Sequence, residues 1–249
     1  MSAGAEHTGE VYVYGVTSVD AEIPDLTGVG DRPVRATSLG DVAAVVSDLP
    51  DLDDFGTPAD IRAHTTVLDG LASRISVLPM AFGTIVPNIG GLREISDPDR
   101  QQQYLAALER VEGATQFSVR ARYVEETVIR ELVQENPAVA RLREATRGQA
   151  PDATHYERIR LGELIVQGMQ DKGAQDAARI VESLQSLARE LRMRETTAAE
   201  DVLDVAALVD RDDQEAFEAA LEDMAASMPA RITFRLVGPQ APYDFVGEA

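Results

Sequence analysis

The segments in the second half of the chain follow an order that few folds accommodate. Residues 117–123 and 230–237 alternate between apolar and polar side chains, as half-buried strands do. The intervening segments, in chain order, are two short helices separated at Pro137, a long helix over 156–191, strands at 192–197 and 202–209, and a helix at 212–228. The order strand, helices, strand, strand, helix, strand is that of the ferredoxin-like fold. We therefore predict a ferredoxin-like (βαββαβ) domain with a long helical insertion.

The first half of the chain predicts a mixed α+β domain. Its strands are expected at 11–16, 34–39, 42–47 and 75–86. Thr57 and Asp97 are each followed by proline, a combination that starts a helix. The apolar stripe of the first helix is expected to comprise Ile61, Leu68, Leu71 and Ile75. Strands followed by a helix, a strand and a second helix make an α+β arrangement.

The boundary between the two domains is expected near Gly113, where the second helix ends. We predict the mixed α+β domain at 1–112, the ferredoxin-like domain at 113–237 and a C-terminal tail at 238–249. With 249 residues, 44% of them apolar, the chain is long enough to bury two such cores.

Charge and motif spacing argue against several classes of function. Acidic residues outnumber basic ones 43 to 23, a net charge of −20, which disfavours binding to nucleic acid or to an anionic membrane. Cysteine is absent, which excludes disulfides, thiolate zinc sites and a thiol nucleophile. None of His7, His64 and His155 has a second histidine at metal-ligand spacing. Phosphate-loop, dinucleotide and nucleophile-elbow motifs are missing. We therefore expect no enzyme activity, metal or cofactor.

The chain is expected to be cytoplasmic. Residues 1–9 have neither the basic start nor the apolar core of a signal peptide. No apolar run approaches the length of about 18 residues that spans a bilayer.

Four sets of segments occur in an order that is typical of one protein family. They lie at 12–16, at 64–71 with 77–84, at 158–163, and at 202–209 with the tail 238–245. The most specific parts are 78–84 and the Gly-Pro…Pro-Tyr-x-Phe pattern of the tail. In these segments the chain resembles the gas vesicle protein F/L family (GvpF/GvpL). The sequence departs from the family pattern at Ala81, where arginine is usual, at Gln240-Ala241, where Trp-Pro is common, and at Asp204, where asparagine is frequent.

The resemblance implies a non-enzymatic accessory or minor structural protein of gas vesicles, which are gas-filled protein shells in the cytoplasm. It implies as partners a very apolar shell protein and other gas vesicle accessory proteins, with no cofactor and no catalytic residues. The net charge of −20 is compatible with that role, because a highly charged partner keeps an aggregation-prone protein in solution. The alternatives are a small-molecule-binding regulatory module, on fold analogy, and an enzyme that uses carboxylates.

Several residues are candidates for a motif or contact role. They are Tyr14, Gly15, His64, Leu78, Pro79, Met80, Phe82, Gly83, Arg120, Arg122, Gly238, Pro239, Pro242, Tyr243 and Phe245. Strand alternation predicts that Leu78, Met80 and Phe82 point into the core of the first domain, while Pro79 and Gly83 fix the backbone. Direct contact of this segment with the shell protein is the alternative.

Arg120 and Arg122 are expected on the sheet face opposite the helices of the second domain. The same face should receive Arg192, Arg194, Arg231 and Arg235. Because the strand at 202–209 is apolar on both sides, we expect Val205 and Val209 to be buried and the arginine face to be covered by the first domain or by the tail. The alternative is a solvated face paired with local acids. The set lacks aromatic residues on which bases could stack, which disfavours a nucleic-acid platform.

Overall fold

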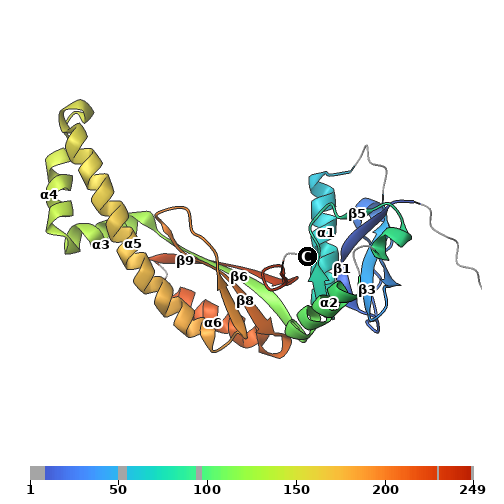
Figure 1. Ribbon diagram of the computed structural model, residues 1–249. Helices are drawn as coiled ribbons and strands as arrows, with labels where there is room; N and C mark the ends of the chain where they lie inside the picture. Colours follow the sequence, from blue (N-terminus) through green and yellow to red (C-terminus); the bar gives the residue numbers. More distant parts are fainter. Residues whose placement is uncertain (1–8, 50–54, 94–96, 229, 248–249) are drawn as a thin grey trace, which may run out of the picture. The chain divides into compact units, whose positions relative to one another are not determined.

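The structure is a computed structural model, and it describes residues 9–49, 55–93, 97–228 and 230–247 (Figure 1). His7 and most of the segment tested for a signal peptide lie outside these ranges. The described chain forms two compact units. Unit 1 contains the residues up to Phe117 and those from Gly238 onward, and unit 2 is Ser118–Val237. The tail residues therefore group with the N-terminal unit.

Unit 1 contains a sheet with helices packed on it. Its strands are β1 (Val11–Ser18), β2 (Arg35–Ser38), β3 (Val42–Asp48), β4 (Val77–Pro79) and β5 (Ile85–Val86), and its α-helices are α1 (Pro58–Ala72) and α2 (Pro98–Arg110). The strand order is β2-β3-β1-β4, with β5 also paired to β1, and these pairings are antiparallel. The central strand β1 is buried from Val11 through Thr17, so both of its faces are covered.

Helix α1 begins as the sequence predicts. The Thr57 side chain accepts a hydrogen bond from the Asp60 backbone, and the Asp60 carboxylate accepts one from the Thr57 backbone, which completes a capping box. Val67, Leu68 and Leu71 of this helix pack in one core cluster with Tyr12 and Tyr14 of β1.

The expected position of Ile61 in the apolar stripe of α1 is wrong. Its side chain is 47% exposed, whereas His64, one turn further along, is only 2% exposed. The buried stripe is centred on His64, Val67 and Leu71, so it includes a polar residue that apolar periodicity does not count. Ile61 lies in the first turn, at the edge of that stripe.

Unit 2 has the predicted ferredoxin-like order. Its elements are β6 (Ala114–Tyr123), α3 (Glu125–Glu135), α4 (Pro137–Thr146), α5 (His155–Gln185), β7 (Glu190–Met193), β8 (Asp201–Asp210), α6 (Gln214–Ser227) and β9 (Ile232–Gln240), with the first residues of β6 and the last of β9 belonging to unit 1. The strand order β7-β8-β6-β9 places the first and third strands side by side at the centre, as the ferredoxin-like fold requires. The α+β fold class is thus confirmed, with α3, α4 and most of α5 as the helical insertion.

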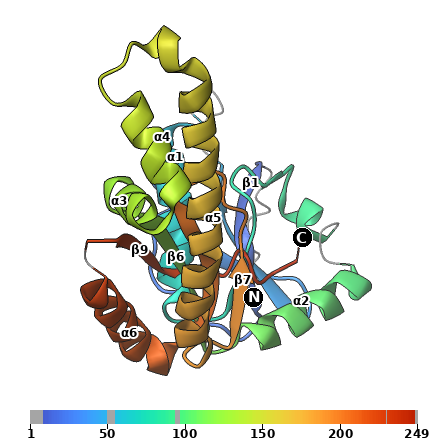
Figure 2. The ribbon, with the colours of Figure 1, turned by 90° about the vertical axis from the view of Figure 1, so that its left-hand side faces the viewer.

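The helices of unit 2 lie on one face of its sheet and also extend beyond it. Helices α5 and α6 pack on β8, while α4 packs on α5 and continues with it past the sheet as an arm (Figures 1 and 2). The long helix ends at Gln185, earlier than the expected 191, and Leu191 belongs to β7. Within the described ranges, every helix is too short or too polar to cross a membrane.

Candidate functional site

Aromatic residues from distant segments meet around one histidine in unit 1. We call Tyr12, Tyr14, His64, Phe82 and Tyr243 the histidine cluster. The His64 ring stacks on Tyr14 at 5.7 Å between centroids and meets the edge of Phe82 at 5.6 Å. Strand β1, helix α1, the turn after β4 and the tail therefore converge on the imidazole.

A chain of hydrogen bonds runs through this cluster, from the Gly83 amide at one end to the Met80 carbonyl at the other. The Tyr12 hydroxyl lies 2.8 Å from Nδ1 of His64 and accepts from the Gly83 amide at 3.2 Å. The Tyr243 hydroxyl lies 3.0 Å from Nε2 of His64 and donates to the Met80 carbonyl at 3.4 Å. Since Tyr243 uses its proton on Met80, Nε2 must donate to Tyr243, and Nδ1 must accept from Tyr12. The geometry assigns the neutral Nε2–H tautomer to His64.

Burial keeps the cluster uncharged. It lowers the pKa of His64 to about 4, although the Met80 carbonyl opposes this shift. Burial also raises the pKa of Tyr243 to about 12 and the pKa of Tyr12 and Tyr14 above the usual tyrosine value. None of these four side chains changes charge near neutral pH, so they are poorly suited to general acid–base catalysis.

The tail is held beside this cluster by polar contacts in unit 1. The Ala241 amide donates to Asp69 of α1 at 2.9 Å. Gln116 and Asp244 form a reciprocal pair, with the Asp244 amide donating to Gln116 Oε1 and Gln116 Nε2 donating to the Asp244 carboxylate. Phe245 is 1% exposed. The tail is therefore a packed part of unit 1.

The predicted motif glycines lie where a side chain would clash or where the backbone conformation favours glycine. A Cβ on Gly15 would collide with the Leu78 carbonyl of the neighbouring strand β4, and one on Gly238 would come within 2.5 Å of the Phe117 ring. Gly83 has φ of +86°, a conformation that favours glycine.

The other motif residues differ in burial. Leu78, Pro79, Met80 and Pro242 are buried, Phe82 is half-buried, and Pro239 is exposed and follows a cis peptide bond. The ring of Phe82 stacks on Phe55 at 5.4 Å, at the rim of the cluster rather than deep in the core.

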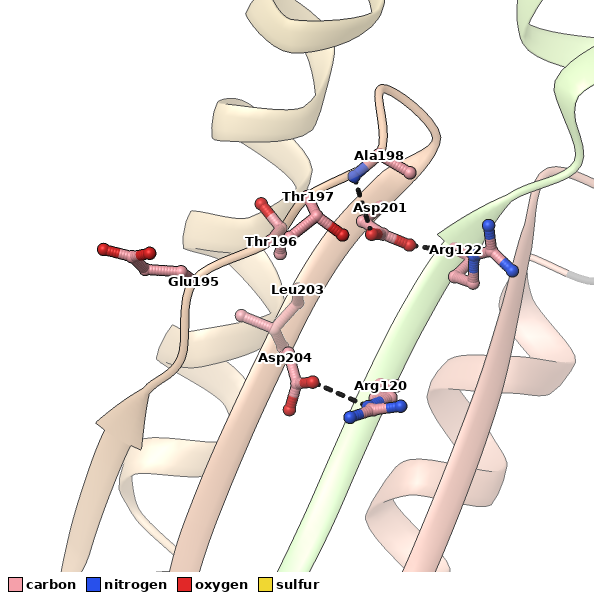
Figure 3. Close-up of a pocket in the computed structure, with 9 residues that line it drawn as sticks. All are labelled: Arg120, Arg122, Glu195, Thr196, Thr197, Ala198, Asp201, Leu203 and Asp204. Carbon is pink, nitrogen blue, oxygen red and sulfur yellow. Dashed lines mark hydrogen bonds and ion pairs between the residues drawn. The ribbon is translucent and has the colours of Figure 1, made fainter. Parts of the chain in front are cut away.

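The structure places Arg120 and Arg122 at a pocket of about 410 Å³ in unit 2 (Figure 3). Arg120 Nε contacts Asp204 at 2.6 Å, and Arg122 contacts Glu200 at 2.5 Å and Asp201 at 2.8 Å. The two arginine side chains remain 58% and 52% exposed. Each guanidinium is thus neutralised by local carboxylates, which agrees with the alternative of a solvated, paired face.

Two further expectations about this sheet have different outcomes. Val205 and Val209 are fully buried, as the apolar strand implied. Arg231 does not join Arg120 and Arg122, because it precedes β9 and turns toward the helices instead. There it contacts Asp176 of α5 at 2.7 Å and Glu131 of α3 at 3.0 Å.

Asp176 is a buried charge that the sequence patterns did not reveal. Its side chain is 5% exposed and is bonded by Arg231 and by the Tyr123 hydroxyl. Burial alone would raise the pKa of Asp176, but these hydrogen bonds overcome that effect and lower it. An acid in register with Gly173, Ile180 and Leu184 on the buried side of α5 is the signal that could have identified it.

Among the described residues, no three histidine, aspartate or glutamate side chains are grouped so that they could hold a metal ion.

Comparison with known proteins identifies the class to which this fold belongs. The family model described as "Gas vesicle synthesis protein GvpL/GvpF" matches residues 10–247. The chain therefore belongs to the GvpL/GvpF family of gas vesicle proteins, and it is a protein of gas vesicle formation. The family is not a known class of enzymes.

Individual relatives cover almost the whole chain. Gas vesicle protein F of Streptomyces sp. (strain CB03234) is 33% identical over 239 residues, which cover 94% of this chain and 98% of the relative. Gas vesicle protein L of the same strain is 29% identical over 96% of this chain and 93% of the relative. The crystal structure of GvpF from Anabaena sp. PCC7120 is similar in fold, with a TM-score of 0.80 at 18% identity over 96% of this chain and 98% of that chain.

Proposed function

We propose that this chain binds the small apolar shell protein of gas vesicles and keeps it soluble in the cytoplasm until it assembles. The observation that carries the proposal is the match to the gas vesicle synthesis family over residues 10–247. A free shell protein exposes apolar surface and tends to aggregate. A bound partner with a net charge of −20 would oppose aggregation by electrostatic repulsion.

The site geometry supports a binding role without turnover. Both ring nitrogens of His64 are engaged by tyrosine hydroxyls, and the cluster is uncharged at neutral pH. In the Arg120/Arg122 pocket, each guanidinium already pairs with a carboxylate of its own chain. This pairing weakens the case for a small anionic ligand, which a regulatory module of the alternative kind would use.

Co-expression tests this function directly. The shell protein is expressed with and without the full chain, and the amount in the supernatant after centrifugation is compared. We expect soluble shell protein only with the chain present, and recovery of the two proteins together on affinity purification. An acidic protein of similar size and charge serves as the control, since charge alone should not solubilise the shell protein. Insoluble shell protein in both cultures would contradict the proposal.

Fractionation of purified gas vesicles would then show whether the chain remains in the mature shell. Its presence there would extend the role from assembly to structure. Other gas vesicle accessory proteins recovered in the same purification would identify further partners.

A further inference from the structure

On one side, the sheet of unit 2 ends at a strand whose outer backbone groups face away from it. The strand order is β7-β8-β6-β9, so among the described strands β7 (Glu190–Met193) pairs with β8 alone. The Arg194 amide, in register with this pairing, donates to the Asp204 carbonyl at 2.8 Å. Because antiparallel strands bond alternate residues, the N–H and C=O groups of Leu191 and Met193 point away from β8. We call Glu190–Met193 the β7 edge.

The two faces of the β7 edge differ in character. Leu191 and Met193 line a groove of about 450 Å³ together with Val181 of α5, so they lie on the helix side of the sheet. The Met193 side chain remains 56% exposed there. By strand alternation, Glu190 and Arg192 lie on the opposite face, where Arg192 Nε contacts the Glu190 carboxylate at 2.8 Å. The edge thus combines outward backbone groups, an apolar groove and a pair of opposite charges.

We propose that the β7 edge pairs in antiparallel orientation with the β7 edge of a second copy of this chain. A twofold axis at Leu191 would place Leu191 opposite itself, and the two residues would exchange N–H···O bonds in both directions. The same register sets Glu190 opposite Arg192 of the second copy, and Arg192 opposite Glu190. The sheets of the two copies would then form one continuous sheet.

The charges favour this register over its neighbours. Hydrogen bonds between the copies require outward-pointing residues to face each other, which restricts where the axis can lie. An axis at Arg192 would set two copies of Arg192 opposite each other, and an axis at Met193 would set Arg192 opposite Arg194. Like charges directly opposite are destabilising. The axis at Leu191 joins Glu190 to Arg192 without a like-charge pair.

The other edge of the same sheet lacks this self-complementarity. Strand β9 (Ile232–Gln240) contains Arg235 and no acidic residue, so two copies of β9 would bring only like charges together. Pro239 within it has no N–H to donate. Of the two edges, β7 is therefore the one that suits a second copy.

Sedimentation velocity of the full chain tests self-association. A strand of this length makes a small contact, so the dimer should be weak and should form only as concentration rises. We expect a shift from monomer to dimer between about 5 and about 500 μM. Salt at about 0.15 M screens the repulsion between two chains of net charge −20 beyond about 8 Å. A monomer at every concentration would overturn the proposal.

Charge reversal tests the pairing itself. Glu190→Arg would set arginine opposite Arg192, and Arg192→Glu would set glutamate opposite Glu190, so each variant should dimerise about tenfold more weakly than the wild type. An equimolar mixture of the two variants should recover the dimer, since each carboxylate then meets a guanidinium of the other chain. Mixing cannot repair a misfolded chain, so recovery distinguishes a contact between copies from a folding defect. A mixture that dimerises no better than its components would overturn the proposal.

Further variants assign the surface. Arg235→Glu reverses a charge on the β9 edge and should leave the dimer unchanged, whereas loss of the dimer would assign it to β9 and overturn the proposal. Met193→Glu should weaken the dimer and leave the amount of co-expressed shell protein that the chain retains unchanged. Loss of retained shell protein with unchanged sedimentation would assign the β7 edge to the shell protein, which would also overturn the proposal. Self-association goes beyond the proposed function, and neither depends on the other.

Discussion

The histidine cluster of unit 1 and the exposed side of helix α5 in unit 2, with Ile159, Gly162 and Val166, both overlap segments that resemble the family, yet their side chains differ in how many partners they have within the chain. In the cluster, both nitrogens of His64 and the hydroxyls of Tyr12 and Tyr243 have partners within the chain. On helix α5, the side chains of Ile159 and Val166 are exposed, and a Cβ at Gly162 would meet nothing within 4 Å. Sequence similarity alone does not show which residues a fold buries and pairs internally. Burial and hydrogen bonding do.

Removing the His64 ring should have the largest effect on stability. His64→Ala would leave a gap among Tyr12, Tyr14 and Phe82 and deprive the Tyr12 hydroxyl of its acceptor. We expect a loss of about 3 kcal/mol in the free energy of unfolding, measured by urea titration with circular dichroism. His155→Ala, at an exposed histidine of α5, is the matched control and should change stability by less than about 0.5 kcal/mol. Equal losses of unfolding free energy in the two variants would contradict the greater importance of the buried histidine for stability.

Acid should destabilise unit 1 through the same residue. The pKa of His64 is about 4 in the folded chain, below the ordinary value of 6.5. Between these values the unfolded chain binds a proton that the folded chain does not, so stability falls as pH falls and is unaffected above about 6.5. From pH 6.5 to 5 this amounts to about 2 kcal/mol. The control is His64→Gln, which has no imidazole to protonate, so its stability should fall less over the same interval. Parallel curves of unfolding free energy against pH for the two proteins would contradict the assignment of the effect to His64.

Tyr12→Phe should have a smaller effect. It keeps the ring but leaves Nδ1 of His64 and the Gly83 amide without a partner, at a cost of about 1–2 kcal/mol in the free energy of unfolding. Binding of shell protein by the folded variant should remain at the wild-type level, because the cluster lies inside unit 1. A variant that is stable but no longer binds shell protein would make the cluster a contact site.

Tyr243→Phe should have the smallest effect. The side chain is 41% exposed, so water can replace the lost partner of Nε2, and we expect less than about 1 kcal/mol. Limited proteolysis should nevertheless cut the tail faster, since Tyr243 joins it to α1 and to Met80. An unchanged rate of cleavage would show that the contacts of Asp69 and Gln116 hold the tail without it.

The sequence predicted the fold more fully than the site. Element order and the Thr57-Pro58 start of α1 follow from local rules, so the ferredoxin-like order and the capping box were predictable. The meeting of Tyr12, His64 and Tyr243 depends on contacts across 52 and 179 residues, which no local pattern encodes. The position of Arg231 was mispredicted for a related reason. Its partner Asp176 lies on helix α5, and the alternation of residues along a strand carries no information about a partner on a helix.

We propose above that this chain keeps an apolar shell protein in solution by binding it, without turnover. Light scattering of shell protein diluted from denaturant, in the presence of increasing amounts of the full chain and without nucleotide, tests it most directly. If the chain binds the shell protein, scattering should fall in proportion to added chain and level off near a fixed molar ratio. Equal scattering with and without the chain would contradict it.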